Sequence, residues 1–303
     1  MRVNVSLFEI RIGPCQKGSP ELTRDSGLSK IVEYSTNNGT TWSASTLATS
    51  GTYYGIAYGN NVYITVASGA TTTQIFNGTS WSNGGALPAT NSWRAVAYGN
   101  VGGTTPTFVA SCQTASGQPA YTTNNGTTWT ACTGVGANTA GIAYGNGKFM
   151  TVAGNGNGSW TSTNGQSFTA QGAIPGGVIT WSGLAYGNGR WVTVSTTFLA
   201  AVSTNDGASW TTVRLPGNTG SIVFAGGVFF AVGSSTFYWS VDGLVWQTGA
   251  GGSFSTSGYG VGYGNGYFVA LQNISSATGA YFQSTNIYPV NYTITPTSYN
   301  ATS

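Results

Sequence analysis

Short stretches of alternating hydrophobic and polar residues run along the chain, and tight-turn signals separate them. Residues 141–153 alternate on both sides of Gly145-Asn146-Gly147, which predicts two antiparallel strands joined by a turn. Residues 160–170 repeat the arrangement around Asn164-Gly165. Asn-Gly and Asp-Gly supply the positive φ angles that two-residue hairpin turns require. The pattern therefore predicts two successive hairpins, or four short strands.

The first hairpin carries a phrase, an aromatic residue followed by Gly-Asn, that recurs along the chain. Its copies are Ala57-Tyr58-Gly59-Asn60, Ala97-Tyr98-Gly99-Asn100, Ala143-Tyr144-Gly145-Asn146, Ala185-Tyr186-Gly187-Asn188, Gly262-Tyr263-Gly264-Asn265 and the degenerate Phe224-Ala225-Gly226-Gly227. The aromatic residue recurs at intervals of 40, 46, 42, 38 and 39 residues. Repeats of about 40–50 residues are typical of the four-stranded blades of β-propellers. We therefore expect one blade per repeat.

The second hairpin carries its own phrase, in which a hydroxyl residue is followed by Asn, Gly and an aromatic residue. The clearest copies are residues 35–42, 122–129 and 203–210, and weaker copies end at Trp81, Phe168, Trp246 and Tyr288. Positive φ at such turns favours Asn, Asp and Gly. We assign structural turn roles to Asn38, Gly39, Asn125, Gly126, Asn164, Gly165, Asp206, Gly207, Asp242 and Gly243.

The aromatic residues of both phrases are expected to pack between neighbouring blades, since large rings at one repeated position bury much apolar area. In the first phrase they are Tyr58, Tyr98, Tyr144, Tyr186 and Tyr263. In the second they are Trp42, Trp81, Trp129, Trp210 and Trp246, which we expect to fasten each hairpin to its neighbour.

The second phrase, Ser/Thr-x-Asn-x-Gly-x-Thr/Ser-Trp, resembles the Asp-box (BNR) hairpin of sialidase-like propellers over most of residues 31–288. The resemblance implies an all-β fold, a single β-propeller of four-stranded blades. The family's aspartate is a structural turn residue, and its place is taken here by Asn37, Asn124 and Asn205. For a sialidase the resemblance also implies three arginines that grip a carboxylate and a Tyr-Glu nucleophile pair. Such a set is not found among Arg94, Arg190 and Arg214, which have no glutamate nearby in the sequence.

Ring closure needs a further element, because about seven second phrases accompany six first phrases. We infer that residues 31–46 supply outer strands to a last blade, which terminal residues such as 292–295 or 3–12 complete. Seven blades are favoured, with six as the alternative. On this interpretation residues 31–303 form the propeller.

Charge is scarce and unevenly distributed. Charged residues make up 5% of the 303 residues, against roughly 25% in ordinary soluble domains. Residues 1–30 hold eight of the fifteen charges and neither repeat phrase. Two interpretations of this segment stay open: a docking arm that fixes the propeller to a larger assembly, or a closing segment of the last blade.

Several partners and cofactors are not expected. A net charge of +3 spread this thinly forms no basic surface for nucleic acid. The chain has neither a stretch long and apolar enough to span a bilayer nor the pattern of a signal peptide, so we expect no membrane insertion and no export by an obvious route. Three cysteines, Cys15, Cys112 and Cys132, without Cys-x-x-Cys spacing and without any histidine predict no disulfide framework, no metal site and no cofactor.

Catalysis is not expected either. Glycosidic hydrolysis normally needs two carboxyl groups about 5–10 Å apart. After Glu33 the chain offers only Asp206 and Asp242, each before the glycine of an outer turn in neighbouring repeats. Because these turns lie at the rims of different blades, the two carboxylates should not meet at one substrate, and we predict no catalytic residue.

A candidate binding site lies on the face opposite the two short turns of each blade, where the longer connections emerge; we call these the long-loop face and the short-turn face. Five residues before each repeated aromatic residue the sequence varies: Tyr53, Trp93, Thr139, Trp181, Thr219 and Gly258. Variation at one repeated position is typical of a site freed from packing, and aromatic rings suit sugars. We predict glycan contacts by Tyr53, Trp93 and Trp181, with Arg94 and Arg214 as donors; alternatively, the rings only plug the end of the propeller.

The low charge and the abundance of Gly, Asn, Thr and Ser resemble phage tail fibres and decoration proteins. We expect a non-enzymatic virion surface protein, assembled in the host cytoplasm, that binds host surface polysaccharide through the long-loop face. Its other partners would be virion structural proteins, bound through residues 1–30. The alternatives are a purely structural capsid or tail decoration without receptor binding, and a secreted, extracellular lectin-like propeller.

Overall fold

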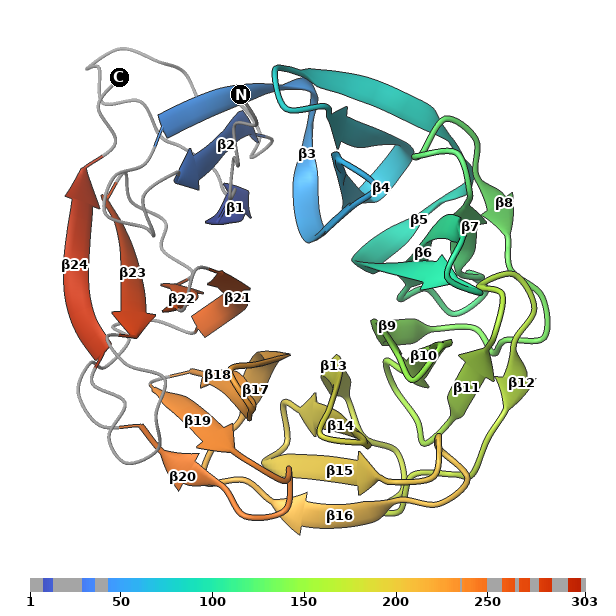
Figure 1. Cartoon of the computed structure of the whole chain (residues 1–303), viewed down its shortest axis with the longest axis vertical. Helices are drawn as coiled ribbons and strands as arrows, with labels where there is room; N and C mark the ends of the chain where they lie inside the picture. The colour runs from blue at the N-terminus through green and yellow to red at the C-terminus, as the bar shows by residue number, and fades with distance from the viewer. Residues whose placement is uncertain are drawn as a thin grey trace.

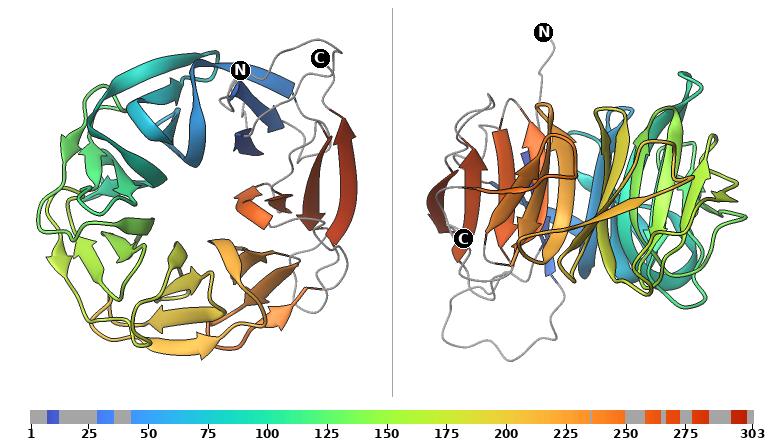
Figure 2. Two further views of the ribbon diagram at one scale, coloured as in Figure 1. Left: turned by 180° about the vertical axis from the view of Figure 1, so that it is seen from behind. Right: turned by 90° about the horizontal axis from the view of Figure 1, so that it is seen from below.

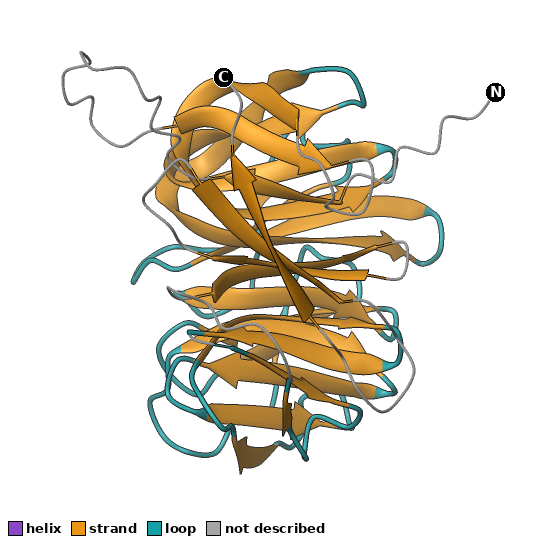
Figure 3. Cartoon of the chain, turned by 90° about the vertical axis from the view of Figure 1, so that its left-hand side faces the viewer, coloured by secondary structure: helices purple, strands orange, loops and turns teal. Residues whose placement is uncertain are grey.

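The computed structural model describes residues 8–12, 29–35, 43–234, 236–249, 258–264, 267–272, 278–284 and 294–300. All regular elements in these ranges are β-strands, which run between the two faces of a ring (Figures 1 and 3). Seen edge-on, the ring is a short cylinder about one strand length thick (Figure 2). In the same ranges no helix is long and apolar enough to cross a membrane. The predicted fold class, a single all-β propeller, is confirmed.

Four blades are separate sheets of four consecutive antiparallel strands. The first two are β9 (Thr139–Gly145), β10 (Lys148–Ala153), β11 (Ser159–Ser162) and β12 (Thr169–Ala170), then β13 (Trp181–Gly187), β14 (Arg190–Ser195), β15 (Leu199–Ser203) and β16 (Thr211–Arg214). The next two are β17 (Thr219–Ala225), β18 (Val228–Gly233), β19 (Phe237–Ser240) and β20 (Gln247–Thr248), then β21 (Gly258–Gly264), β22 (Tyr267–Gln272), β23 (Thr278–Ser284) and β24 (Ile294–Asn300).

Long strands link the blades that precede these. The last parts of β3 (Ser43–Gly59) and β5 (Trp81–Val101) are innermost strands of two successive blades, and their first parts lie in the blade before. The two parts of β4 (Val62–Phe76) lie side by side, since the side chains of Ile64 and Ile75 both reach Gly126. The later of these blades continues with β6 (Thr105–Cys112), β7 (Ala120–Thr122) and β8 (Thr130–Ala131).

The N-terminal and C-terminal strands pair with different sheets. β1 (Phe8–Ile12) pairs with β2 (Ser29–Ser35), which pairs with the first part of β3, whereas β24 pairs with β23. Of the two terminal segments predicted to complete the last blade, the N-terminal one therefore joins the sheet that contains residues 31–46. The described strands form six four-stranded blades and this three-stranded sheet. The count of seven blades, and the division at residue 30, stay predictions.

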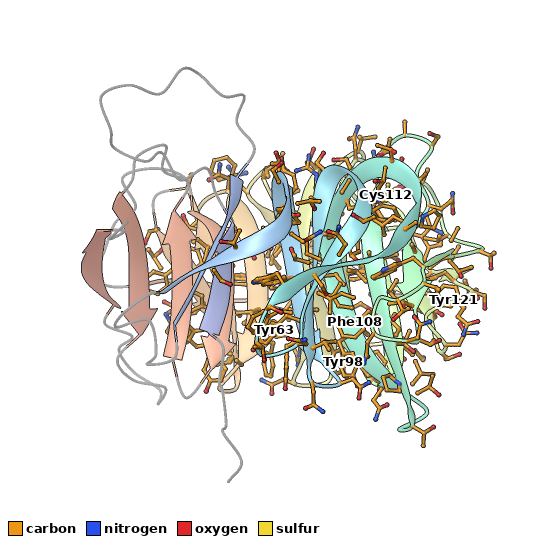
Figure 4. All side chains as sticks on the ribbon, turned by 90° about the horizontal axis from the view of Figure 1, so that it is seen from above. Tyr63, Tyr98, Phe108, Cys112 and Tyr121 are labelled. Carbon is orange, nitrogen blue, oxygen red and sulfur yellow. The ribbon has the colours of Figure 1, made fainter. Side chains whose placement is uncertain are left out.

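Neighbouring blades fit together through an aromatic ring seated on a glycine. A Cβ atom on the glycine of the first phrase would collide with the aromatic ring of the next copy: Gly59 with Tyr98, Gly99 with Tyr144, Gly145 with Tyr186 and Gly187 with Phe224. Within its own blade, Tyr98 also lies 4.9 Å from Phe108, centroid to centroid (Figure 4). The predicted packing role is confirmed for these rings, and Ala225 replaces the glycine at the next seam.

The tryptophans of the second phrase are buried where the structure describes them, at Trp81, Trp129, Trp210 and Trp246. Trp129 Nε1 donates to Thr73 Oγ1, and Trp210 Nε1 donates to Ser159 Oγ, both at 3.3 Å and both on the preceding blade. These indoles fasten one blade to the next as expected. The side chain of Trp42 lies outside the described residues.

Candidate functional site

The outer turns have the backbone geometry that Asn-Gly and Asp-Gly predict. Positive φ angles occur at Asn125 (56°), Gly126 (81°), Gly165 (73°), Asp206 (54°), Gly207 (86°) and Gly243 (71°). Asn164 and Asp242 instead use their side chains: Asn164 Oδ1 accepts from the N–H groups of Gln166 and Ser167, and Asp242 Oδ1 from those of Leu244 and Val245. Asn38 and Gly39 lie outside the described residues.

Asn124 takes the place of the aspartate in the Asp-box pattern, and its contacts explain why asparagine serves there. Its Oδ1 accepts from the Thr128 N–H at 3.0 Å, while its Nδ2 donates to Thr128 Oγ1 at 2.9 Å. The side-chain oxygen satisfies the backbone with or without a negative charge. Asn124 thus makes the hydrogen bonds that close this turn.

Asp206 joins two blades at the short-turn face. Its carboxylate accepts hydrogen bonds from Lys148 Nζ at 2.6 Å, from Asn146 Nδ2 at 3.1 Å and from Trp191 Nε1 at 3.0 Å. Partial burial alone would raise the pKa of Asp206, but these hydrogen bonds and the Lys148 charge outweigh it and lower the pKa. The carboxylate is thus ionised and fully engaged in holding β10 to the next blade.

Asp242 occupies the equivalent outer turn one blade further on. Partial burial opposes its ionisation, yet the N–H groups of Val245 and Leu244, the Ser240 hydroxyl and the Arg190 charge lower its pKa. Arg190 Nη1 also donates to the Asp242 carbonyl oxygen at 3.0 Å. Asp206 and Asp242 therefore serve separate turns of separate blades.

The structure corrects the predicted glycan contacts of Tyr53, Trp93 and Trp181. All three side chains are buried, Trp93 and Trp181 completely. Tyr53 Oη donates to the Thr49 carbonyl at 2.9 Å, and Trp181 Nε1 donates to the Gly156 carbonyl at 3.1 Å. Rings enclosed in this way offer no face to a sugar, so the alternative interpretation, that they plug the long-loop end, accounts for them.

The physical reason is a β-bulge that follows the variable position. The register of the innermost strand against its neighbour shifts between Tyr53 and Gly55, between Trp93 and Ala95, and between Trp181 and Gly183. The extra residues are Tyr54, Arg94 and Ser182. A bulge redirects one side chain out of the regular alternation. The residue that varies at the surface is therefore four, rather than five, before the repeated aromatic residue.

Tyr54 and Arg94 meet across two adjacent blades at the centre of the long-loop face. The guanidinium carbon of Arg94 lies 4.1 Å from the ring centroid of Tyr54, within the range of a cation–π contact. Tyr54 is 38% exposed. Arg94 Nε is buried without a hydrogen-bond partner, and so is Trp93 Nε1. The exposed tyrosine ring and the guanidinium group that lies over it mark this position as a candidate binding site.

Arg214 lies on the same face but not in the same site. It ends β16, the outermost strand of its blade, and its guanidinium carbon is 5.8 Å from the ring centroid of Phe198. Arg94 belongs to an innermost strand two blades earlier. The two predicted donors therefore belong to separate surfaces, one central and one at the rim.

The described ranges contain no group of three or more His, Cys, Asp or Glu residues able to hold a metal ion. Cys112 and Cys132 are buried free thiols. Burial raises the pKa of both, opposed at Cys112 by hydrogen bonds with Thr114. Neutral, buried thiols are poor nucleophiles. Cys15 lies outside the described residues.

Comparison with protein-family models finds no match, and comparison with curated protein sequences finds none either. Solved structures are similar. A catalytically inactive virginiamycin B lyase from Staphylococcus aureus with quinupristin has a TM-score of 0.67 at 12% identity, over 89% of this chain and 93% of that chain. YCF48 bound to D1 peptide has a TM-score of 0.58 at 14% identity, over 88% of each chain. YCF48 from Cyanidioschyzon merolae has 0.57 at 13%, over 87% of this chain and 91% of that one. At such identities these likenesses show the fold, and the chain is a β-propeller.

Proposed function

We propose that this protein is a non-enzymatic binding propeller of a bacteriophage particle that contacts host surface glycan through the centre of its long-loop face. The observation that carries the proposal is the pair formed by Tyr54 and Arg94, with their cation–π distance of 4.1 Å. Bulge residues at the open end of innermost strands are well placed to meet a partner, because no further strand covers them.

The chemistry of the pair suits a sugar. A partly exposed tyrosine ring presents an apolar surface to the C–H groups of a pyranose, while its hydroxyl and the guanidinium meet ring hydroxyls. Fold alone would not establish this role.

The non-enzymatic part of the proposal draws on Asp206 and Asp242, the two carboxylates that follow Glu33 in the sequence. Asp206 is bound by Lys148, Asn146 and Trp191, and Asp242 supports its own turn. These structural contacts account for the lowered pKa values of both carboxylates. The virion setting draws on composition, namely few charges and many small polar residues.

The test compares particles that carry Tyr54→Ala with Arg94→Gln against particles that carry Thr130→Ala, an exposed residue of the outermost strand β8. We expect the double variant to assemble normally and to adsorb to host cells at least tenfold more slowly, while the control adsorbs like wild type. Immunogold labelling of intact particles should place the protein at the surface. Normal adsorption of the double variant would rule out the receptor role.

A purely structural decoration is the second candidate, and a different observation favours it. Val241, Leu244 and Val245 are exposed together on one outer turn of the short-turn face. Exposed apolar side chains gathered on one rigid turn are typical of contact surfaces. If Leu244→Ser with Val245→Ser prevents incorporation into particles while the Tyr54 and Arg94 variant adsorbs normally, the decoration role replaces the receptor role.

A further inference from the structure

Phe198 is held in an unfavourable backbone conformation with its ring at the surface. It ends the short connection between β14 and β15, has φ of +64° and is 43% exposed. A bulky residue rarely adopts the left-handed region, which glycine and asparagine adopt at a lower energetic cost. Gly69 and Gly156 hold positive φ angles between the second and third strands of two other blades. Phenylalanine at this place therefore costs conformational energy that glycine would avoid.

The connection is held rigidly in this shape. Ser195 Oγ accepts from the N–H groups of Thr197 and Leu199, at 3.2 and 3.1 Å. The Leu215 N–H donates to the Phe198 carbonyl at 2.9 Å. The ring is thus presented outward by a fixed backbone, and strain of this kind collects where a side chain is needed for function.

Arg214 extends the surface around Phe198, and the connection from β12 to β13 borders the strand that follows Phe198. Arg214 is paired opposite Leu199 and places its guanidinium carbon 5.8 Å from the ring of Phe198. The connection from β12 to β13 passes beside Leu199, because a Cβ on Gly176 would lie 3.9 Å from Leu199 Cδ1. Val178 of that connection is 75% exposed. Phenylalanine and arginine are both enriched at protein–protein interfaces.

Charge indicates what binds there. Among the side chains that the structure describes, Arg214 has no carboxylate partner, and both carboxylates, Asp206 and Asp242, serve turns of the short-turn face. We propose that Phe198 and Arg214 form a second binding surface, at the rim, for an acidic protein segment that pairs a carboxylate with an apolar side chain. The surface is separate from Tyr54 and Arg94 and does not depend on the glycan proposal.

The test uses a fluorescein-labelled, N-acetylated peptide of sequence Glu-Glu-Trp-Leu-Glu-Glu and fluorescence anisotropy at low ionic strength. We expect the peptide to bind, and Phe198→Asn and Arg214→Gln each to weaken binding at least tenfold. The peptide with glutamine in place of glutamate should not bind. Thr130→Ala, an exposed residue of β8 outside every site named above, should bind like wild type.

A thermal melt separates function from folding. Asparagine tolerates the left-handed region, so Phe198→Asn should melt no lower than wild type although it loses the peptide. Equal binding of the glutamine peptide, or unchanged binding by Phe198→Asn, would overturn the proposal. Polygalacturonate that competes fully with the peptide and is itself lost in Phe198→Asn would assign the surface to acidic glycan instead.

Discussion

The ring of Tyr98 occupies the space over Gly59 of the preceding blade that a Cβ atom at residue 59 would need. Gly59→Ala should therefore push the ring out of its seat and destabilise the fold by about 1–3 kcal/mol, as overpacking usually does. Urea denaturation measures the loss. In the background Tyr98→Ala, where the ring is absent, the added methyl group should lower the stability much less. An equal loss of stability in that background would contradict the packing of Tyr98 on Gly59.

The outer turn at Asn124 should accept aspartate but not alanine. Asn124→Asp keeps the oxygen that accepts from the Thr128 N–H, so stability should change little. Asn124→Ala leaves that donor without its partner, and we expect a loss of about 1 kcal/mol. Melting temperatures of the two variants at neutral pH decide the matter. Equal destabilisation by both variants would mean that the side-chain oxygen is not what holds the turn.

The carboxylate of Asp206 should make stability depend on pH. Its pKa is lowered in the folded protein relative to the unfolded chain. The stabilisation is therefore present above the unfolded pKa of about 4 and is lost as the pH falls through the folded value. Asp206→Asn should cost about 1 kcal/mol at pH 7, and the difference from wild type should shrink towards pH 2. Urea denaturation over this range tests it, and a gap that widens in acid would contradict the assignment.

Glycan cleavage should not depend on the two carboxylates. The purified protein should release no sugar from host polysaccharide. The double variant Asp206→Asn with Asp242→Asn should keep wild-type adsorption when carried on particles, once its lower stability is allowed for. Reducing-sugar release that disappears in the double variant would overturn the non-enzymatic proposal.

Deletion of residues 1–30 should lower the stability of the propeller. The deletion removes β1, which pairs with β2 at Phe8↔Ser35 and Ile12↔Val32, and so exposes the edge of a sheet. We expect a lower melting temperature and some aggregation. A truncated protein that melts like wild type but fails to join particles would favour the docking arm over the closing segment.

The repeat architecture could be predicted because its determinants are local. Asn-Gly turns and aromatic-Gly phrases act within a few residues, and Tyr98, Tyr144 and Tyr186 all pack as their repeated position indicated. The packing of an aromatic ring on the glycine of the preceding blade joins residues about forty apart. The spacing of the phrases was the only signal of this contact in the sequence.

The sequence predicts Arg94 as a donor but misses Tyr54, which follows the predicted Tyr53. Variation at Tyr53, Trp93 and Trp181 indicates the end of the innermost strand at which Tyr54 and Arg94 meet. The bulge that moves Tyr54 and Arg94 to the surface is a register shift against the second strand, and a pattern of period two cannot reveal an inserted residue. Variation at the adjacent position, where Tyr54, Arg94 and Ser182 stand, was the available signal. Phe198 could not be found in this way, because its strain is a property of the backbone.

Ala225 stands where four other seams have glycine, and Tyr263, whose ring would take that seat, is 37% exposed. The methyl group of Ala225 packs into a buried cluster that spans this boundary, in which the rings of Phe230 and Phe268 stack with their centroids 4.6 Å apart. Stacking between blades thus takes over here from the contact between ring and glycine. Loss of either phenylalanine ring should therefore open the propeller first between β17 and β21, and backbone amides along that boundary would then exchange with deuterium before those of the blades on the far side.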